Sequence, residues 1–189
     1  MRQVRVTELL RCPQYKPLSF MDEYQLYGLV AHAVVESRMP VHCVREPELK
    51  LRLHIDDEEV ELVGHPDVIC GSEIYEIKPY PKLTNQLKIF SRQLLIYGNM
   101  YKRLYFETPR LVLIFYKVAM EGVSVDKQEV FYEDIWDWLT TWVRNYVHLT
   151  EKGKLYVRTY LCSSCGLRKE CPLFTVYRDK KLVFIPRGE

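Results

Sequence analysis

Alternating and continuous apolar positions predict several β-strands in the first half of the chain. Leu49 to Ile55 alternates apolar and polar residues, and the acidic turn that follows leads into the apolar run from Val60 to Val63. This pattern is typical of a β-hairpin. Val68 to Cys70 and Ile74 to Lys78 predict two further strands separated by a glycine-containing turn.

Helical periodicity occurs before, between and after these strands. Thr7 to Arg11 predicts a short helix or turn, and Met21 to Arg38 has apolar spacing compatible with a helix that Pro40 closes. Thr84 to Arg103 predicts a second long helix, and Tyr132 to Thr150 a tryptophan-rich third one. In the second long helix the residues expected to face inward are Leu87, Phe90, Leu94 and Leu95.

Two strands complete the predicted pattern. Leu111 to Val118 is almost continuously apolar, as in a strand that is buried on both faces, and Val123 to Val130 predicts its neighbour. The order helix, strands, helix, strand indicates a mixed α/β protein. A length of 189 residues suits one domain, 1–189, with a sizeable core.

Composition and charge exclude few classes of protein. The chain is 48% hydrophobic and 28% charged, with a net charge of +2, which permits nucleic-acid binding without arguing for it. No apolar run has the length of a membrane span, and no signal peptide is visible, so we expect a cytoplasmic protein without a membrane partner. Basic residues gather in two regions: Lys78, Lys82, Lys88, Arg92, Lys102 and Arg103, and then Lys152, Lys154, Arg158, Arg168 and Lys169.

An acidic and basic cluster is predicted at the centre of the chain. Asp67 lies among apolar neighbours, where an acid is costly to bury unless something binds it. Glu76 and Lys78 are two residues apart on a predicted strand and therefore point to the same face. Two carboxylates and a lysine that converge are what a Mg²⁺-dependent phosphodiester hydrolase requires.

Four short motifs resemble those of the RecB-type branch of the PD-(D/E)XK nucleases. They are Gly28-x-x-x-His32, Gly64-x-x-Asp67, Glu76-x-Lys78 and Gln93-x-x-x-Tyr97, in this order. Each alone has an ordinary explanation: a core histidine, a solvated strand face, or the polar edge of a helix. Their joint occurrence in this order is far more specific.

This resemblance implies a restriction-endonuclease-like fold, in which a mixed sheet is flanked by helices. It also implies a metal site for Mg²⁺ or Mn²⁺ formed by His32, Asp67, Glu76 and the main-chain carbonyl of Ile77. Lys78 is then expected to orient the nucleophile or to stabilise the transition state. Gln93 and Tyr97 are expected to position the DNA backbone or a water molecule. The catalytic set implied is Asp67, Glu76, Lys78, Gln93 and Tyr97.

The C-terminal cysteines carry a second signal. Cys162, Cys165 and Cys171 lie within ten residues, which suits a metal site better than a core. In a cytoplasmic protein the six cysteines are not expected to form disulfides. A four-thiolate site needs one more cysteine. Zinc and an iron–sulfur cluster both remain open on spacing alone.

Three cysteines could supply the fourth thiolate. Cys70 ends an apolar run, where cysteine usually behaves as a small hydrophobic residue. Cys43 lies in a loop with no supporting pattern. Cys12 is followed by proline, as Cys171 is, and is the preferred candidate.

The cysteine pattern resembles the iron–sulfur nucleases of the RecB-like group, among them the CRISPR-associated exonucleases. This implies a [4Fe–4S] cluster, or a [2Fe–2S] cluster, held by Cys12, Cys162, Cys165 and Cys171. Segments 7–13 and 151–175 would form the cysteine element that joins the two ends of the chain.

The resemblance also implies a function. We expect a metal-dependent exonuclease that digests single-stranded DNA, mainly from 5′ to 3′. It would process DNA before CRISPR spacer integration, with the integrase proteins as partners. The alternatives are a DNA-repair or viral nuclease of the same type, and a non-catalytic iron–sulfur DNA-binding scaffold.

Overall fold

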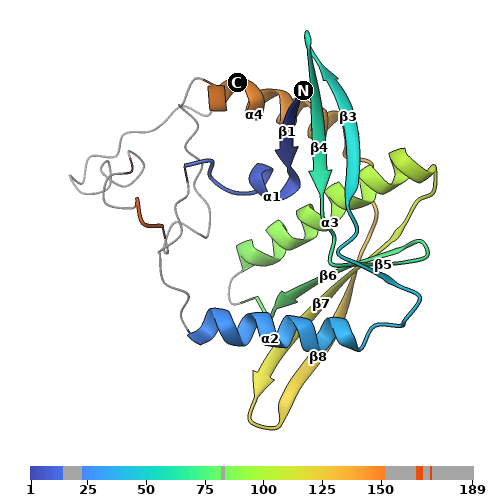
Figure 1. The fold of residues 1–189 in the computed structure, drawn as a ribbon, viewed down its shortest axis with the longest axis vertical. Helices are drawn as coiled ribbons and strands as arrows, with labels where there is room; N and C mark the ends of the chain where they lie inside the picture. The colour runs from blue at the N-terminus through green and yellow to red at the C-terminus, as the bar shows by residue number, and fades with distance from the viewer. Residues whose placement is uncertain (15–22, 82–83, 152–164, 168–170, 172–189) are drawn as a thin grey trace.

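The described residues form two β-sheets with helices packed on both sides (Figure 1). The computed structural model describes residues 1–14, 23–81, 84–151, 165–167 and 171. In chain order the elements are β1 (Arg2–Arg5), α1 (Val6–Leu9), α2 (Glu23–Ser37), β2 (Val44–Arg45), β3 (Leu49–Ile55), β4 (Glu58–Gly64), β5 (Val68–Cys70), β6 (Glu73–Pro79), α3 (Thr84–Tyr105), β7 (Arg110–Ala119), β8 (Gly122–Val130) and α4 (Trp136–Glu151).

The smaller sheet has the strand order β1-β4-β3. β3 and β4 form the predicted antiparallel hairpin, and Ile55 pairs with Glu58 next to its turn. β1 lies parallel to β4 on the other side, where Val4 pairs with Leu62. Four residues are too few to give a clear periodic signal, so the sequence did not predict β1.

The larger sheet has the order β2-β5-β6-β7-β8 and is mixed. β6 and β7 are parallel and are joined through α3, whereas the other neighbouring strands are antiparallel. Leu111 to Tyr116 of β7 are all buried, which confirms the prediction of a strand covered on both faces. Beyond this segment β7 and β8 project as an exposed hairpin (Figure 1).

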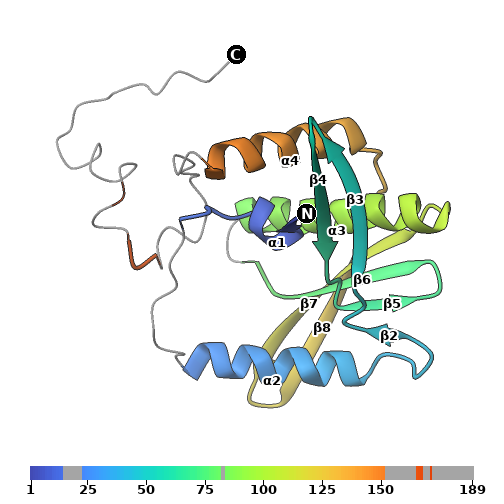
Figure 2. The same cartoon turned by 45° about the horizontal axis from the view of Figure 1, so that its top comes forward.

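Helices cover the larger sheet from two sides. α2 packs against one face, with Ala31 and Val35 next to Ile77 and Ile114. α3 covers the opposite face, and beyond it lie α4, α1 and the smaller sheet (Figure 2). The side chains of both sheets share the core around α3, which includes Leu62, Ile74, Leu94, Leu113 and Leu139. The structure thus confirms a mixed α/β arrangement with a mixed sheet flanked by helices.

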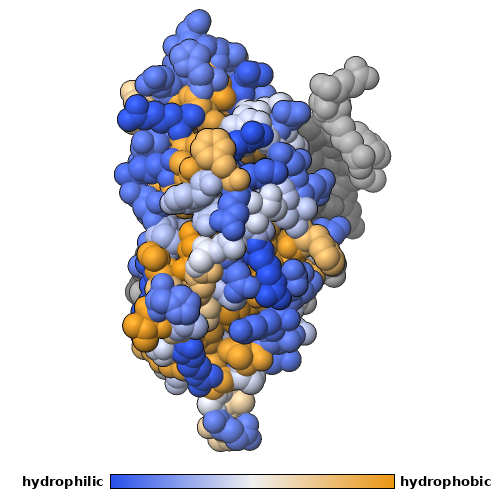
Figure 3. All heavy atoms as spheres, turned by 90° about the vertical axis from the view of Figure 1, so that its right-hand side faces the viewer, coloured by the Kyte–Doolittle hydropathy of each residue, from blue (hydrophilic) through white to orange (hydrophobic). Residues whose placement is uncertain are grey.

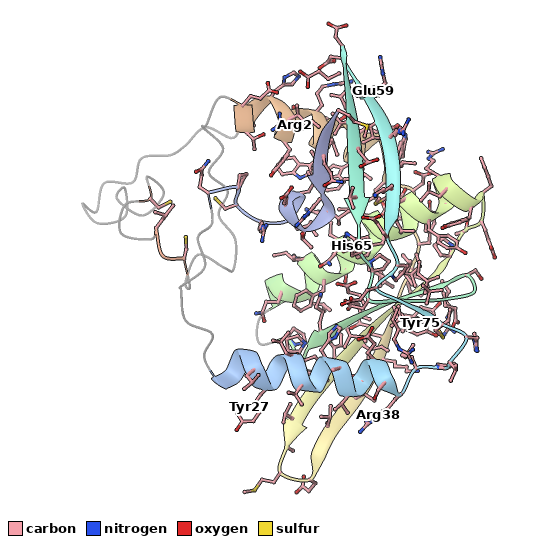
Figure 4. The ribbon with its side chains drawn as sticks, viewed as in Figure 1. Arg2, Tyr27, Arg38, Glu59, His65 and Tyr75 are labelled. Carbon is pink, nitrogen blue, oxygen red and sulfur yellow. A yellow bond between two sulfur atoms is a disulfide. The ribbon has the colours of Figure 1, made fainter. Side chains whose placement is uncertain are left out.

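The buried face of α2 leaves out several of its large apolar residues. Leu26, Leu29 and Val30 are 55%, 58% and 56% exposed. Tyr27 points away from the sheet (Figure 4). Because apolar residues occur nearly all round this helix, its periodicity does not determine which face is buried. On the face of the molecule shown in Figure 3, apolar side chains are frequent in the lower half, whereas polar ones predominate near the upper end.

A disulfide between Cys43 and Cys70 overturns the expectation that the cysteines stay unpaired. The two-residue strand β2 pairs antiparallel with β5, so that Val44 lies opposite Ile69. This register places Cys43 opposite Cys70, with their Cα atoms 4.4 Å apart. The two residues of β2 are too few to show a strand pattern, so in the sequence Cys70 resembles an ordinary apolar residue.

Candidate active site

Five of the predicted site residues meet in a hollow between the two sheets. The hollow has a volume of about 170 Å³ and lies beside the end of β4, where Figure 4 shows His65. Its lining includes Asp67, Glu76, Lys78, Gln93 and Tyr97, which come from the segment before β5, from β6 and from α3. A larger hollow of about 580 Å³ lies near the chain start and Glu59, at the other end of β4 (Figure 4), and contains none of these residues.

Asp67 is positioned where β5 begins beside β6. Its Oδ2 accepts a hydrogen bond from the main-chain N–H of Ile77 at 2.6 Å. The pairing of β5 with β6 ends at Tyr75. Beyond that point the Asp67 side chain supplies the hydrogen-bond acceptor that β5 no longer offers to β6. The N–H and C=O of one residue point to the same side of a strand. The Ile77 carbonyl therefore also faces the side on which Asp67 lies.

Glu76 is the most deeply buried acid of the site, with only 1% of its surface exposed. Its Oε1 lies 2.5 Å from Nζ of Lys78 and accepts a hydrogen bond from Nε2 of Gln93 at 2.7 Å. Its Oε2 is also buried but has no hydrogen-bond partner in the described part of the chain. Burial raises the pKa of Glu76 to about 7, although Lys78 acts in the opposite direction.

Gln93 and Tyr97 form the inner wall of the hollow. They lie one helical turn apart on α3, and Nε2 of Gln93 is 2.9 Å from the Tyr97 hydroxyl. Both are buried, with 8% and 1% of their surface exposed. Burial raises the pKa of Tyr97, which keeps the phenol neutral. They were expected to position the DNA backbone or a water molecule, whereas in this structure Gln93 directly holds the carboxylate of Glu76.

His32 approaches the site from the α2 side of the sheet. Its Nε2 lies 3.3 Å from Oδ2 of Asp67, and its Nδ1 lies 3.9 Å from Glu36. The contact with Asp67 raises the pKa of His32, although partial burial opposes this. Asp67 is thus in contact with His32 from α2 and with the main-chain N–H of Ile77, the residue after Glu76 on β6.

These donors fit a hard divalent cation by their chemistry. Two carboxylates, one imidazole and the Ile77 carbonyl offer oxygen and nitrogen ligands. Glu76 adds a buried oxygen that has no hydrogen-bond partner among the described residues. In the described ranges, no three His, Cys, Asp or Glu side chains are already arranged as a metal cluster. The side chains are instead held by internal donors: Ile77 and His32 contact Asp67, and Lys78 and Gln93 contact Glu76.

The N-terminal segment contributes to the hollow in a way that the sequence did not predict. Arg5, Val6 and Thr7, at the junction of β1 and α1, line the same space as Asp67. Arg5 and Thr7 are exposed, and nothing in their local pattern points to a site. Their position follows from the pairing of β1 with β4, which places Arg5 opposite Val63.

Two basic residues of the first region, Lys102 and Arg103, do not line the hollow. Lys102 and Arg103 belong to the last turn of α3. They stack on Tyr132 and Trp136, at 5.0 Å and 4.7 Å from the ring centres. Lys82 lies outside the described residues.

The predicted cysteine element is described only in part. Cys12, Cys165 and Cys171 are half-buried, and the main-chain N–H of Cys171 donates to the Leu167 carbonyl at 2.8 Å. Cys162 and most of 151–175 lie outside the described residues. The four-cysteine cluster therefore stays a prediction.

Comparisons with known proteins establish the fold. No protein-family model and no curated protein sequence matches the chain. The crystal structure of SSO0001 superposes with a TM-score of 0.65 at 18% sequence identity, over 92% of this chain and 87% of that one. This chain and SSO0001 therefore share a fold, which alone does not define an activity.

A more distant structure is that of a candidate exonuclease from Eubacterium rectale. It has a TM-score of 0.48 and 8% identity, over 93% of this chain and 68% of that one. A likeness this weak has no bearing on function. Among the described residues, no helix is long and apolar enough to cross a membrane.

Proposed function

We propose that this protein is a divalent-metal-dependent nuclease that hydrolyses phosphodiester bonds in DNA at the site of Asp67, Glu76 and Lys78. The observation that carries the proposal is the buried Oε2 of Glu76, which has no hydrogen-bond partner in the described residues, beside the short contact between Glu76 and Lys78. A buried carboxylate oxygen is costly to leave unsatisfied, and a bound cation would satisfy it.

Each side chain has a distinct part in this reaction. His32, Asp67, Glu76 and the Ile77 carbonyl would hold Mg²⁺ or Mn²⁺, which lowers the pKa of water and polarises a phosphate when bound. Lys78, which is half-buried beside Glu76, orients the attacking oxygen and stabilises negative charge on the phosphate.

Gln93 and Tyr97 act indirectly. They keep the Glu76 carboxylate in one orientation through the hydrogen bond that Gln93 donates and through the contact between Gln93 and the Tyr97 hydroxyl. Their burial fits this positioning role.

The finer proposal follows from the resemblance of the motifs. The enzyme would be an exonuclease that acts on single-stranded DNA, mainly from 5′ to 3′, before CRISPR spacer integration, with integrase proteins as partners. A [4Fe–4S] cluster, or a [2Fe–2S] cluster, would be held by Cys12, Cys162, Cys165 and Cys171, because thiolates are the ligands that such clusters take. The same site chemistry would serve a DNA-repair or viral nuclease.

Digestion of end-labelled single-stranded DNA tests the central proposal. The protein is purified without oxygen and incubated with 5′- or 3′-labelled DNA and Mn²⁺, beside Lys78→Ala. Lys127→Ala is the matched control, because Lys127 is an exposed lysine on β8 and lies away from the hollow. The visible spectrum of each sample reports an iron–sulfur cluster.

We expect wild-type and Lys127→Ala proteins to release labelled nucleotides and Lys78→Ala to lose at least about a hundredfold in rate. DNA binding without cleavage in all three proteins would favour the non-catalytic scaffold. Equal cleavage by all three would show that the chemistry takes place at another site.

A further inference from the structure

A second cavity adjoins the candidate active site. It has a volume of about 340 Å³ and lies between α1 and the N-terminal half of α3. Lys78, Gln93 and Thr7 line both this cavity and the smaller hollow that contains Asp67 and Glu76. The two spaces are therefore neighbours that share these three side chains.

The remaining wall of this cavity is mainly apolar, with a few polar groups. Leu10, Ile89 and Phe90 supply aliphatic and aromatic surface. Gln86 adds an amide from α3, and Arg11 an exposed cation from the segment after α1. An apolar space with a few polar groups that fix orientation is the usual form of a small-molecule site.

We propose that this cavity is a nucleoside subsite that binds the base and sugar of the nucleotide next to the phosphodiester bond being cleaved. The inference rests on the proposed nuclease function, because it is the phosphate beside Lys78 that places the adjoining nucleoside in the cavity. Its volume is near the lower end of the ~300–1,000 Å³ range of small-ligand sites, which suits a single nucleoside.

The chemistry of the walls matches such an occupant. Ile89 and Phe90 present surface to the face of a base, and a base of any sequence has such a face. Arg11 lies at the edge of the cavity, where it can neutralise the next phosphate of the strand. The subsite should accordingly recognise the presence of a base more than its identity.

The occupant can be tested by binding without cleavage. The affinity of the full chain for a short oligothymidylate is compared with its affinity for the same backbone without bases, by fluorescence anisotropy in Ca²⁺. The variants are Ile89→Trp, which fills the cavity, and Ile89→Ala, which enlarges it. Val125→Trp is the matched control, because Val125 is exposed on β8.

In the wild-type and Val125→Trp proteins, removal of the bases should weaken binding about tenfold. This difference should vanish in Ile89→Trp and shrink in Ile89→Ala, with circular dichroism confirming that both are folded. Equal affinities for the two backbones in the wild-type protein would overturn the subsite. The protein could also bind DNA in a base-dependent way that Ile89→Trp abolishes and yet cleave no DNA. That result would support the subsite and reject the proposed nuclease function.

Discussion

The ring of Tyr97 lies directly against the main chain of Gly64. A β-carbon at Gly64 would be 2.8 Å from Cε1 and 2.9 Å from Cδ1 of that ring. Such separations are shorter than van der Waals contact, so position 64 admits only glycine while Tyr97 keeps its place. Since Tyr97 contacts Gln93 and Gln93 holds Glu76, a glycine at the end of β4 indirectly determines where the buried acid lies.

Gly64→Ala should destabilise the protein by about 1–3 kcal/mol, because the new methyl group forces the buried Tyr97 ring to move. The free energy of unfolding in urea measures the effect. Gly28→Ala is the matched control. Its β-carbon would lie 3.5 Å from the Tyr116 hydroxyl, which is an ordinary contact, and alanine favours the α2 helix. Equal losses in both variants would contradict the steric explanation.

Asn99 should be the most important polar residue of the core outside the site. It is 1% exposed, and its side chain donates to the carbonyls of Leu95 and Glu133 and accepts from the N–H of Ile135. Asn99→Ala should cost about 2–4 kcal/mol, because main-chain groups before α4 lose their partners. Asn145→Ala, an exposed asparagine on α4, should change stability by less than about 0.5 kcal/mol. Thermal unfolding of both variants distinguishes them.

Local patterns predicted the parts of the site that depend on one element. Glu76 and Lys78 share a strand face because strand side chains alternate, and Gln93 and Tyr97 share a helix face because they are four residues apart. The approach of His32 to Asp67 joins segments 35 residues apart and was implied only by the resemblance of the motifs.

Contacts across the fold carried no local signal. The strands β1 and β2 are too short to show a period. The disulfide, which depends on the pairing of β2 with β5, and the position of Arg5, which depends on the pairing of β1 with β4, could therefore not be predicted from the sequence. The face of α2 that is buried depends on the sheet that it covers. Asn99 likewise looked like any polar residue of a helix, because its partners lie 34 and 36 residues further along the chain.

The disulfide between Cys43 and Cys70 should contribute substantially to stability. It closes a loop between residues 27 apart, and the loop-entropy description gives about 3–4 kcal/mol for this length. A thiol reductant should therefore lower the melting temperature of the wild-type protein by roughly 10 °C. The measurement is thermal unfolding with and without dithiothreitol, followed by circular dichroism.

A variant without these two sulfur atoms separates this effect from other cysteines. The double variant Cys43→Ser, Cys70→Ser should have the melting temperature of the reduced wild-type protein. Dithiothreitol should not lower that temperature further through these two positions. If the double variant had the same melting temperature as the oxidised wild-type protein, the disulfide would contribute nothing to stability.

Glu76 should make stability fall as the pH rises towards neutrality. Its pKa is raised in the folded protein from 4.5 to about 7. Between these values the folded protein keeps a proton that the unfolded chain has released, so the free energy of unfolding decreases with pH. The loss approaches about 3 kcal/mol above pH 7. Glu76→Gln cannot ionise and should remove this dependence, which urea unfolding in EDTA across the pH range would measure.

A divalent cation should reverse the loss in the wild-type protein alone. Mn²⁺ at a hundredfold excess over its dissociation constant would add about 2.7 kcal/mol to the folded state above pH 7, where Glu76 is ionised. Glu76→Gln should gain much less, and Glu58→Gln, an exposed glutamate on β4, should behave like the wild-type protein. The pKa of His32 is also raised, so ionisation of this residue likewise lowers the free energy of unfolding as the pH rises above its ordinary value of 6.5. The variant His32→Gln removes this second contribution and leaves that of Glu76. Equal stabilisation of the wild-type and Glu76→Gln proteins by Mn²⁺ would place the cation elsewhere, because a ligand that stabilises both does not depend on the carboxylate.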